Sequence, residues 1–170
     1  MRLSLLTFAL LLTPIAHAQY ANRSLGIGVQ ASSSIAHSPL LALTLDFSLY
    51  IENGFDLFIR FPFSMTHVPV GADTPSGAGD IFATGGSIGV RYFFLEETLR
   101  PWVGIQLSGL VLVTKPDVTW FVGPGASAGV DYFFTDSIAA GLRGSYDFFA
   151  MLNETPRHNL SAGLSVSVLF

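Results

Sequence analysis

The sequence contains no cysteine and few charged residues. Only 12% of its 170 residues are Asp, Glu, Lys or Arg, against roughly 25% in a typical soluble domain. The absence of cysteine excludes disulfide bonds, thiolate-bound metals and a lipoprotein anchor, which needs a cysteine at its cleavage site. The formal net charge is −4 and no basic cluster is present, so nucleic-acid binding has no electrostatic support.

Long hydrophobic runs are also missing. Half of the residues are hydrophobic, yet after the first 16 residues no stretch approaches the roughly 20 apolar residues that a transmembrane helix needs. Gly, Ser, Thr, Asp or Arg interrupts the downstream apolar stretches at every second or third position. An apolar content that is distributed in this way favours strands over helices.

The first segment has the pattern of a secretory signal peptide. Met1 and Arg2 form a short positive start, residues 3–15 are mostly apolar, and Ala16-His17-Ala18 supplies an A-x-A cleavage motif. The apolar stretch is too short for a membrane-spanning helix. We therefore predict cleavage after Ala18, which leaves residues 19–170 as a single domain.

A period of two dominates the remaining chain. From Leu41 to Ile51 every odd-numbered residue is a large apolar one, whereas the even positions include Thr44, Asp46 and Ser48. This alternation is typical of a strand with one apolar and one polar face. Asn53-Gly54 then marks a tight hairpin turn, and the alternation resumes. Similar segments cover residues 24–30, 41–51, 55–66, 82–94, 102–113, 118–134, 138–148 and 160–170.

Eight such segments predict an all-β, eight-stranded antiparallel up-and-down transmembrane barrel. Each is about as long as a tilted strand must be to cross a membrane, and an even number closes the sheet without edges. Short connections near residues 52–54, 95–99 and 135–137 alternate with longer ones near 32–39, 67–80 and 150–158. The connection at 114–117 is shorter than expected. Short turns on the periplasmic side and long outer loops are usual in such barrels, so both termini are expected in the periplasm.

Aromatic residues cluster at the expected ends of the strands, where aromatic girdles mark the two membrane interfaces. On the side of the short connections these residues are Phe55, Tyr92, Phe94, Tyr132, Phe134 and Phe170. Toward the other end they are Phe63, Phe82, Trp120, Tyr146 and Phe148.

Four stretches resemble small outer-membrane barrels of the OmpA/OmpX kind. They are the related strand ends Gly-Val-Arg-Tyr-Phe-Phe (89–94) and Gly-Val-Asp-Tyr-Phe-Phe (129–134), the strand 139–146, and the terminal Leu-Ser-Val-Ser-Val-Leu-Phe (164–170). The resemblance covers essentially the whole mature chain and implies a location in the bacterial outer membrane. It also implies that Val166, Val168 and Phe170 form the signal read by the barrel-assembly machinery. Because the sequence stops at the last strand, a peptidoglycan anchor is not expected.

Charged residues fall on the face that would line the lumen: Asp46, Asp56, Arg60, Arg91, Asp131, Arg143 and Asp147. If residues 52–54 are the turn, Ile51 pairs with Phe55 and Asp46 lies directly opposite Arg60, where opposite charges can pair. Similar counting places Asp131 diagonal to Arg143, with Asp147 on the same face. A plug of ion pairs is the favoured interpretation, because an eight-stranded interior is about filled by side chains. A narrow charge-lined pore is the alternative.

Leu110 and Leu112 break the polar lumen pattern. They could line an entry for an apolar ligand, but a β-bulge that turns both toward lipid is the preferred explanation. A soluble lipocalin-like barrel with an apolar interior is disfavoured, because too few charges remain to solvate its exterior.

The histidines suggest two further kinds of site. His37, His67 and His158 fall in or beside expected outer loops with Asp73, Asp80, Asp117 and Glu154, but none has ligand spacing within its loop, so no metal or other cofactor is predicted. Some outer-membrane barrels are lipopolysaccharide deacylases with a His-x-Ser pair. The nearest match is His158-Asn-Leu-Ser161, whose extra residue places the two side chains on opposite faces of a strand.

The sequence thus favours a non-enzymatic envelope protein with a structural or surface-contact role. Its expected partners are outer-membrane lipids and the barrel-assembly machinery. The alternatives are a small passive pore or hydrophobic-ligand conduit and, less favoured, a lipid-modifying enzyme. Nothing in the sequence indicates the oligomeric state.

Overall fold

The computed structural model describes residues 22–33, 40–68, 79–95, 97–114, 117–150 and 156–170. The predicted signal peptide, residues 1–18, and most of the expected outer loops lie outside these ranges, so cleavage after Ala18 stays a prediction. No helix among the described residues is long and apolar enough to cross a membrane.

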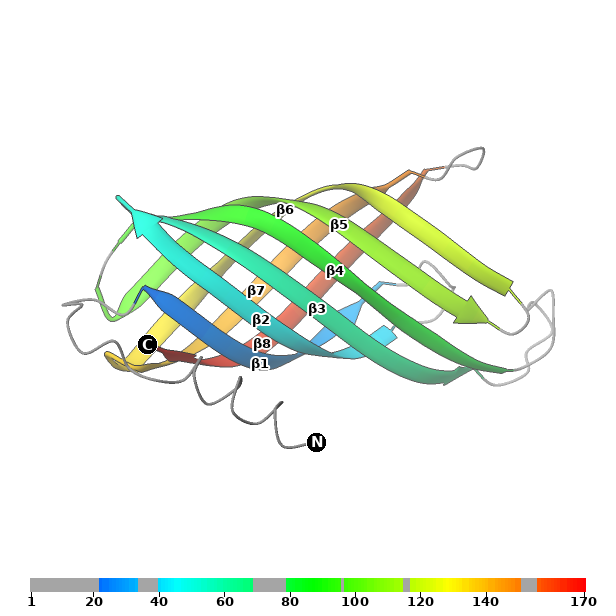
Figure 1. Cartoon of the computed structure of the whole chain (residues 1–170), viewed down its shortest axis with the longest axis horizontal. Coiled ribbons are helices and arrows are strands. Elements are labelled where there is room, and N and C mark those ends of the chain that lie inside the picture. The colour runs from blue at the N-terminus through cyan, green and yellow to red at the C-terminus, as the bar shows by residue number, and fades with distance from the viewer. Residues whose placement is uncertain (1–21, 34–39, 69–78, 96, 115–116, 151–155) are drawn as a thin grey trace, which may run out of the picture.

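Eight strands make up the described structure. They are β1 (Arg23–Ser32), β2 (Leu40–Glu52), β3 (Phe55–Val68), β4 (Gly79–Phe93), β5 (Leu99–Thr114), β6 (Asp117–Thr135), β7 (Ile138–Phe149) and β8 (Arg157–Leu169). Each pairs antiparallel with its neighbours in sequence, and β8 pairs with β1, so that the sheet closes into a barrel (Figure 1). The predicted fold class is confirmed.

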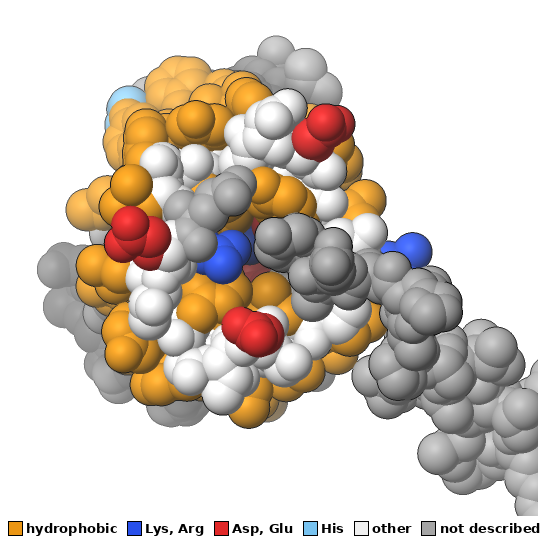
Figure 2. Space-filling model, turned by 90° about the vertical axis from the view of Figure 1, so that its left-hand side faces the viewer, with side chains coloured by type: hydrophobic (Ala, Val, Ile, Leu, Met, Phe, Trp, Pro, Cys, Tyr) orange, Lys and Arg blue, Asp and Glu red, His pale blue; other side chains and the backbone are white. Residues whose placement is uncertain are grey.

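The two ends of the barrel differ. The start of β1 and the ends of β2, β4, β6 and β8 lie at one end of the barrel, here called the turn end (Figure 1). Figure 2 views this end and shows acidic side chains spaced around its rim. The ends of β1, β3, β5 and β7 lie at the opposite end of the barrel, here called the loop end (Figure 1).

The β2–β3 turn follows the Asn-Gly signal but differs in detail from the prediction. Asn53 and Gly54 both have positive φ, 53° and 83°, as a two-residue hairpin turn of type I′ requires. The turn pairs Glu52 with Phe55, so the expected pairing of Ile51 with Phe55 was wrong. A register shift between Tyr50 and Glu52 compensates, and Asp46 is paired with Arg60 as predicted.

The outer surface of the barrel is apolar from one aromatic girdle to the other. The odd-numbered residues of β2 and those of β3 from Phe55 to Met65 point outward, as do Ile105 on β5 and Leu142 on β7. Ile105 is 71% exposed, whereas Arg60 on the lumen face is 5% exposed. The distribution is the reverse of a soluble protein's, which rules out the lipocalin-like alternative. Such a surface is stable in contact with lipid hydrocarbon.

We expect Ile105→Arg to destabilise the folded barrel in a bilayer by about 2–4 kcal/mol, the cost of a guanidinium near the bilayer midplane. The measurement is urea unfolding of the protein in lipid vesicles, with Ile105→Leu as the control. Equal unfolding free energies for Ile105→Arg and Ile105→Leu would contradict the assignment of this surface to lipid.

Candidate functional site: the filled lumen

The lumen side chains are arranged in layers along the barrel axis. Alternation on each strand directs one set of side chains inward, and barrel closure brings residues of distant strands together. Toward the turn end lies a cluster around Arg91, followed by one around Asp46 and then by the Asp147 carboxylate. Apolar side chains fill the loop end.

Asp46 accepts hydrogen bonds from two arginines of different strands. Its neighbour across the β2–β3 ladder, Arg60, donates from Nε to Oδ1 at 2.5 Å. Arg143 reaches across the lumen from β7 and donates from Nη1 to both carboxylate oxygens at 2.9 Å. Thr44 also donates to Oδ2 at 3.2 Å. Both guanidinium groups are almost fully buried, so each depends on this one carboxylate for charge compensation.

Arg91 has the complementary arrangement, one base between two acids. Its Nη2 donates to Asp56 at 3.0 Å, and its Nη1 donates to Asp131 at 3.4 Å. Trp102 donates its indole N–H to the other oxygen of Asp131 at 3.3 Å, and its ring lies 5.3 Å from the Arg91 guanidinium carbon. Charge-assisted hydrogen bonds and cation–π contacts together stabilise this mostly buried guanidinium.

The contacts of Asp131 and Asp147 differ from the simplest expectation. Asp131 is diagonal to Arg143 in the β6–β7 register, as predicted, but the ion pair it makes is with Arg91. Asp147 accepts hydrogen bonds from the neutral groups of Gln106 and Ser108, each at 2.7 Å. Its side chain is buried among these uncharged donors.

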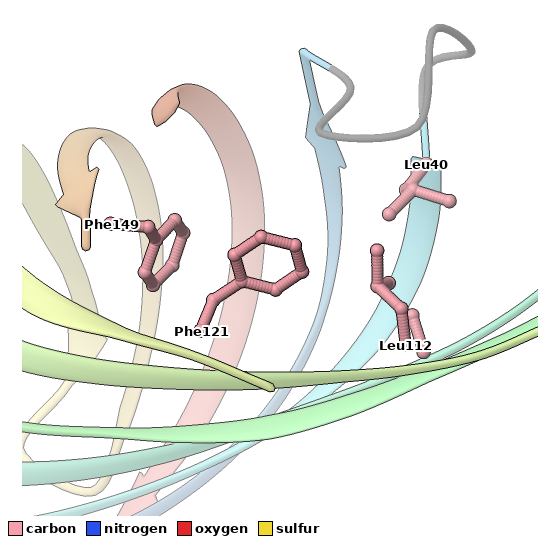
Figure 3. Packing of buried hydrophobic residues seen from close by; sticks show 5 residues of the cluster. Leu40, Leu112, Phe121 and Phe149 are labelled. Atoms are coloured by element: carbon pink, nitrogen blue, oxygen red, sulfur yellow. The ribbon is translucent and has the colours of Figure 1, made fainter. Parts of the chain in front are cut away.

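An apolar cluster closes the loop end of the lumen. Leu40, Leu112, Phe121 and Phe149 form this cluster (Figure 3) together with Ala83, and each of the five is at most 6% exposed. Leu110 packs against them. The rings of Phe121 and Phe149 lie 6.0 Å apart. We call this group the apolar cap.

The preferred β-bulge at Leu110 and Leu112 was therefore wrong. The register of β5 with β4 and with β6 is continuous through both residues, so both remain on the lumen face. The lumen is simply not polar along its whole length. Once past Ser108, the inward positions of β5 belong to the apolar cap.

Very little empty space remains between the charged clusters. The interior cavity that Asp46, Arg60, Arg91, Asp131 and Arg143 line has a volume of about 30 Å³. Such a cavity has room for only a few water molecules, since about 10–15 Å³ of space of this kind is needed to hold one. The charged side chains, rather than open space, therefore occupy most of this part of the lumen.

Several lumen residues were missed from the sequence. Gln106, Ser108 and Trp102 all contact the charged groups. The period of two could have placed them on the lumen face, but nothing in the sequence indicated which carboxylate or guanidinium each would reach.

The histidine candidates do not come together in the described residues. His37 lies outside them, and so do Asp73 and Glu154 among the nearby acids. His67 lies in β3 and His158 in β8. No group of three or more potential metal ligands is present among the residues that the structure describes.

The His158–Ser161 pair has the geometry expected from the sequence. His158 is exposed on the outer surface, whereas Ser161 is buried in the lumen and hydrogen-bonded to Ser145 at 2.6 Å. The imidazole cannot act as the base for this hydroxyl. His158 is instead hydrogen-bonded through Nδ1 to the hydroxyl of Tyr146.

The C-terminal residues lie at the seam between β8 and β1. Val166 and Val168 point outward and are each 52% exposed. The backbone of Phe170 exchanges hydrogen bonds with that of Arg23, at 2.9 and 3.2 Å. This strand completes the barrel, and its predicted role as an assembly signal stays a prediction.

A closed eight-stranded barrel with an apolar exterior and a filled polar lumen is the fold of a small bacterial outer-membrane protein. No protein-family model matches the sequence, and no curated protein matches it. Three solved structures of similar fold are OprG, an outer membrane protein from Pseudomonas aeruginosa, Neisserial surface protein A (NspA), and the outer membrane enzyme PagL.

These likenesses cover nearly the whole of each chain at low sequence identity. OprG is 11% identical with a TM-score of 0.65, over 90% of this chain and 98% of its own. NspA is 16% identical with a TM-score of 0.59, over 87% and 96%. PagL is 11% identical with a TM-score of 0.52, over 86% and 99%. They confirm the predicted resemblance at the level of the fold.

Proposed function

We propose that this protein is a non-enzymatic, non-conducting component of the bacterial outer membrane, with a structural or surface-contact role. The observation that carries the proposal is the filled lumen: two compensated Arg–Asp clusters, the apolar cap, and an interior cavity of about 30 Å³ between the charged groups. A protein built to pass solutes would need an open path at this position.

The absence of a nucleophile–base pair at His158 and Ser161 supports the non-enzymatic role at that candidate site. In this proposal the turn end faces the periplasm, and the loop end presents its connections at the cell surface. Lipids surround the apolar exterior. The barrel-assembly machinery inserts the chain and recognises the last strand through Val166, Val168 and Phe170.

Conductance in planar bilayers tests the closed lumen. We expect the refolded protein to be electrically silent, because ions would have to displace buried ion pairs to pass. Heat-modifiable migration in gels must show first that the barrel has folded. Stable openings of the wild-type protein, with a selectivity that changes in Asp46→Ala or Arg60→Ala, would overturn the proposal in favour of a narrow pore.

A further inference from the structure

The outer surface of the barrel carries a groove among its otherwise protruding apolar side chains. The groove has a volume of about 840 Å³ and extends from Phe55 on β3 across to Leu160 on β8. Ala126, Ala128 and Gly144 provide the small residues of its floor, whereas Ile105 and Leu160 stand beside it. Ile105 and Leu160 are 71% and 62% exposed.

The small residues of the floor are adjacent because of the strand register. Ala128 on β6 is directly paired with Gly144 on β7, and Ala126 is paired with Tyr146. All of them occupy outward positions of their strands, so the depression lies on the lipid-facing surface. A glycine within a strand commonly marks a place where a ligand or another backbone approaches closely.

The barrel itself has room for a side chain at Gly144. A Cβ atom there would meet no atom closer than the Ser161 carbonyl oxygen at 3.8 Å, an ordinary contact. The glycines of the lumen face are different, since a Cβ on Gly123 would lie 1.8 Å from the Phe148 carbonyl oxygen. The groove can therefore be filled by substitution without disturbing the barrel interior.

A polar pair lies at one end of the groove. Tyr146 lines the groove, and its hydroxyl is hydrogen-bonded to His158 Nδ1. Phe148 packs edge-on against the imidazole, with ring centroids 5.3 Å apart. His158 is the second residue of β8, so the pair lies near the loop end, at the level where lipid headgroups meet the barrel.

The hydrogen bond between Tyr146 and His158 uses one of their two hydrogen-bond donors, so the other donor can bind a partner outside the pair. If the tyrosine hydroxyl donates to Nδ1, the neutral imidazole carries its proton on Nε2; if Nδ1–H donates, the hydroxyl proton is available instead. In either case one N–H or O–H remains at an interface where phosphate and ester oxygens are the abundant acceptors.

We propose that this groove is a specific binding site for one phosphate-bearing lipid, whose acyl chain lies on Ala126, Ala128 and Gly144 and whose headgroup accepts a hydrogen bond from the Tyr146–His158 pair. The groove is continuous with the surface that contacts lipid. A second copy of the chain would meet it with an outward face that is mainly apolar, whereas a lipid brings both the chain and the acceptor. The inference rests on the membrane insertion proposed above.

Native mass spectrometry tests this site with dimyristoylphosphatidylglycerol added to the refolded protein in detergent. We expect one retained lipid. Gly144→Phe should weaken retention about tenfold, the effect of displacing about two buried methylene groups. Gly109→Phe is the matched control, because Gly109 also points outward, lies outside the groove, and has no atom within 3.8 Å of its added Cβ. It should retain the lipid.

The headgroup contact is tested by His158→Ala, which should weaken retention about fivefold, the value of one hydrogen bond of about 1 kcal/mol. Equal retention by wild type and Gly144→Phe, or equal loss in Gly144→Phe and Gly109→Phe, would overturn the site. So would a dimer of the chain that Gly144→Phe disrupts. Every variant is first checked for heat-modifiable folding and for electrical silence, so that failure of insertion or of the closed lumen is recognised separately.

Discussion

Asp46→Ala is expected to lower the free energy of unfolding by about 3–5 kcal/mol, the usual cost of removing one partner from a buried ion pair. The reason is the sharing of one carboxylate by two buried arginines, Arg60 and Arg143. Without Asp46, two guanidinium groups with side-chain exposures of 6% each have lost their direct ion-pair partner. Urea unfolding in lipid vesicles, followed by intrinsic tryptophan fluorescence, measures the loss.

Two further variants separate charge from packing in this experiment. Glu52→Ala removes an exposed carboxylate at the turn end and should stay within about 0.5 kcal/mol of wild type. Adding Arg143→Met to Asp46→Ala removes one of the two arginine charges that Asp46→Ala leaves unpaired. The double variant should recover part of the lost free energy of unfolding, with a coupling between the two substitutions of about 0.5–3 kcal/mol. A change of less than about 0.5 kcal/mol in Asp46→Ala would show that the cluster contributes little to stability.

The period of two made the barrel and its two faces predictable. Because alternate side chains of a strand point to opposite faces, the assignment of Asp46, Arg60, Arg91 and Arg143 to the lumen followed directly from position. The pairing of Asp46 with Arg60 was also predictable, since it depends only on one hairpin turn. The predicted pairing at the turn itself was wrong. Asp46 still pairs with Arg60 only because the register shift near Tyr50 compensates for that difference.

Contacts across the lumen could not be predicted in the same way. Arg143 on β7 reaches Asp46 on β2, and Arg91 on β4 reaches Asp131 on β6. These strands are not neighbours in the sheet. Which residues meet depends on how far the closed barrel shifts one strand along another and on the reach of long arginine side chains. The period of two shows on which face of the sheet a side chain lies, but it does not show at which level along the barrel axis the side chain lies.

The apolar cap illustrates a second limit. Leu110 and Leu112 were interpreted as a bulge because the lumen was expected to be polar throughout. The structure keeps them inside, where they meet Leu40, Phe121 and Phe149 from three other strands. Apolar side chains can bury one another inside a barrel as they do in a soluble core, provided that enough of them reach the same level.

Phe121→Ala is expected to destabilise the barrel by about 3–5 kcal/mol, the range for truncating a buried phenylalanine. Phe121 is 2% exposed and packs against Phe149 within the apolar cap. The truncation removes the ring from the closed end of the lumen and leaves its neighbours without contacts. Urea unfolding measures the loss, and Phe134→Ala is the matched control, because that ring points outward and is 63% exposed.

The position of the cap also predicts how the two layers of the lumen combine. Since the apolar cap and the Asp46 cluster occupy different levels and share no direct contact among the interactions described, the losses in Phe121→Ala and Asp46→Ala should add within about 0.5 kcal/mol. Strict additivity would mean that each layer stabilises the folded barrel independently of the other. A large coupling would mean that the cap stabilises the ion pairs by excluding water from the loop end, and that the lumen is one cooperative unit.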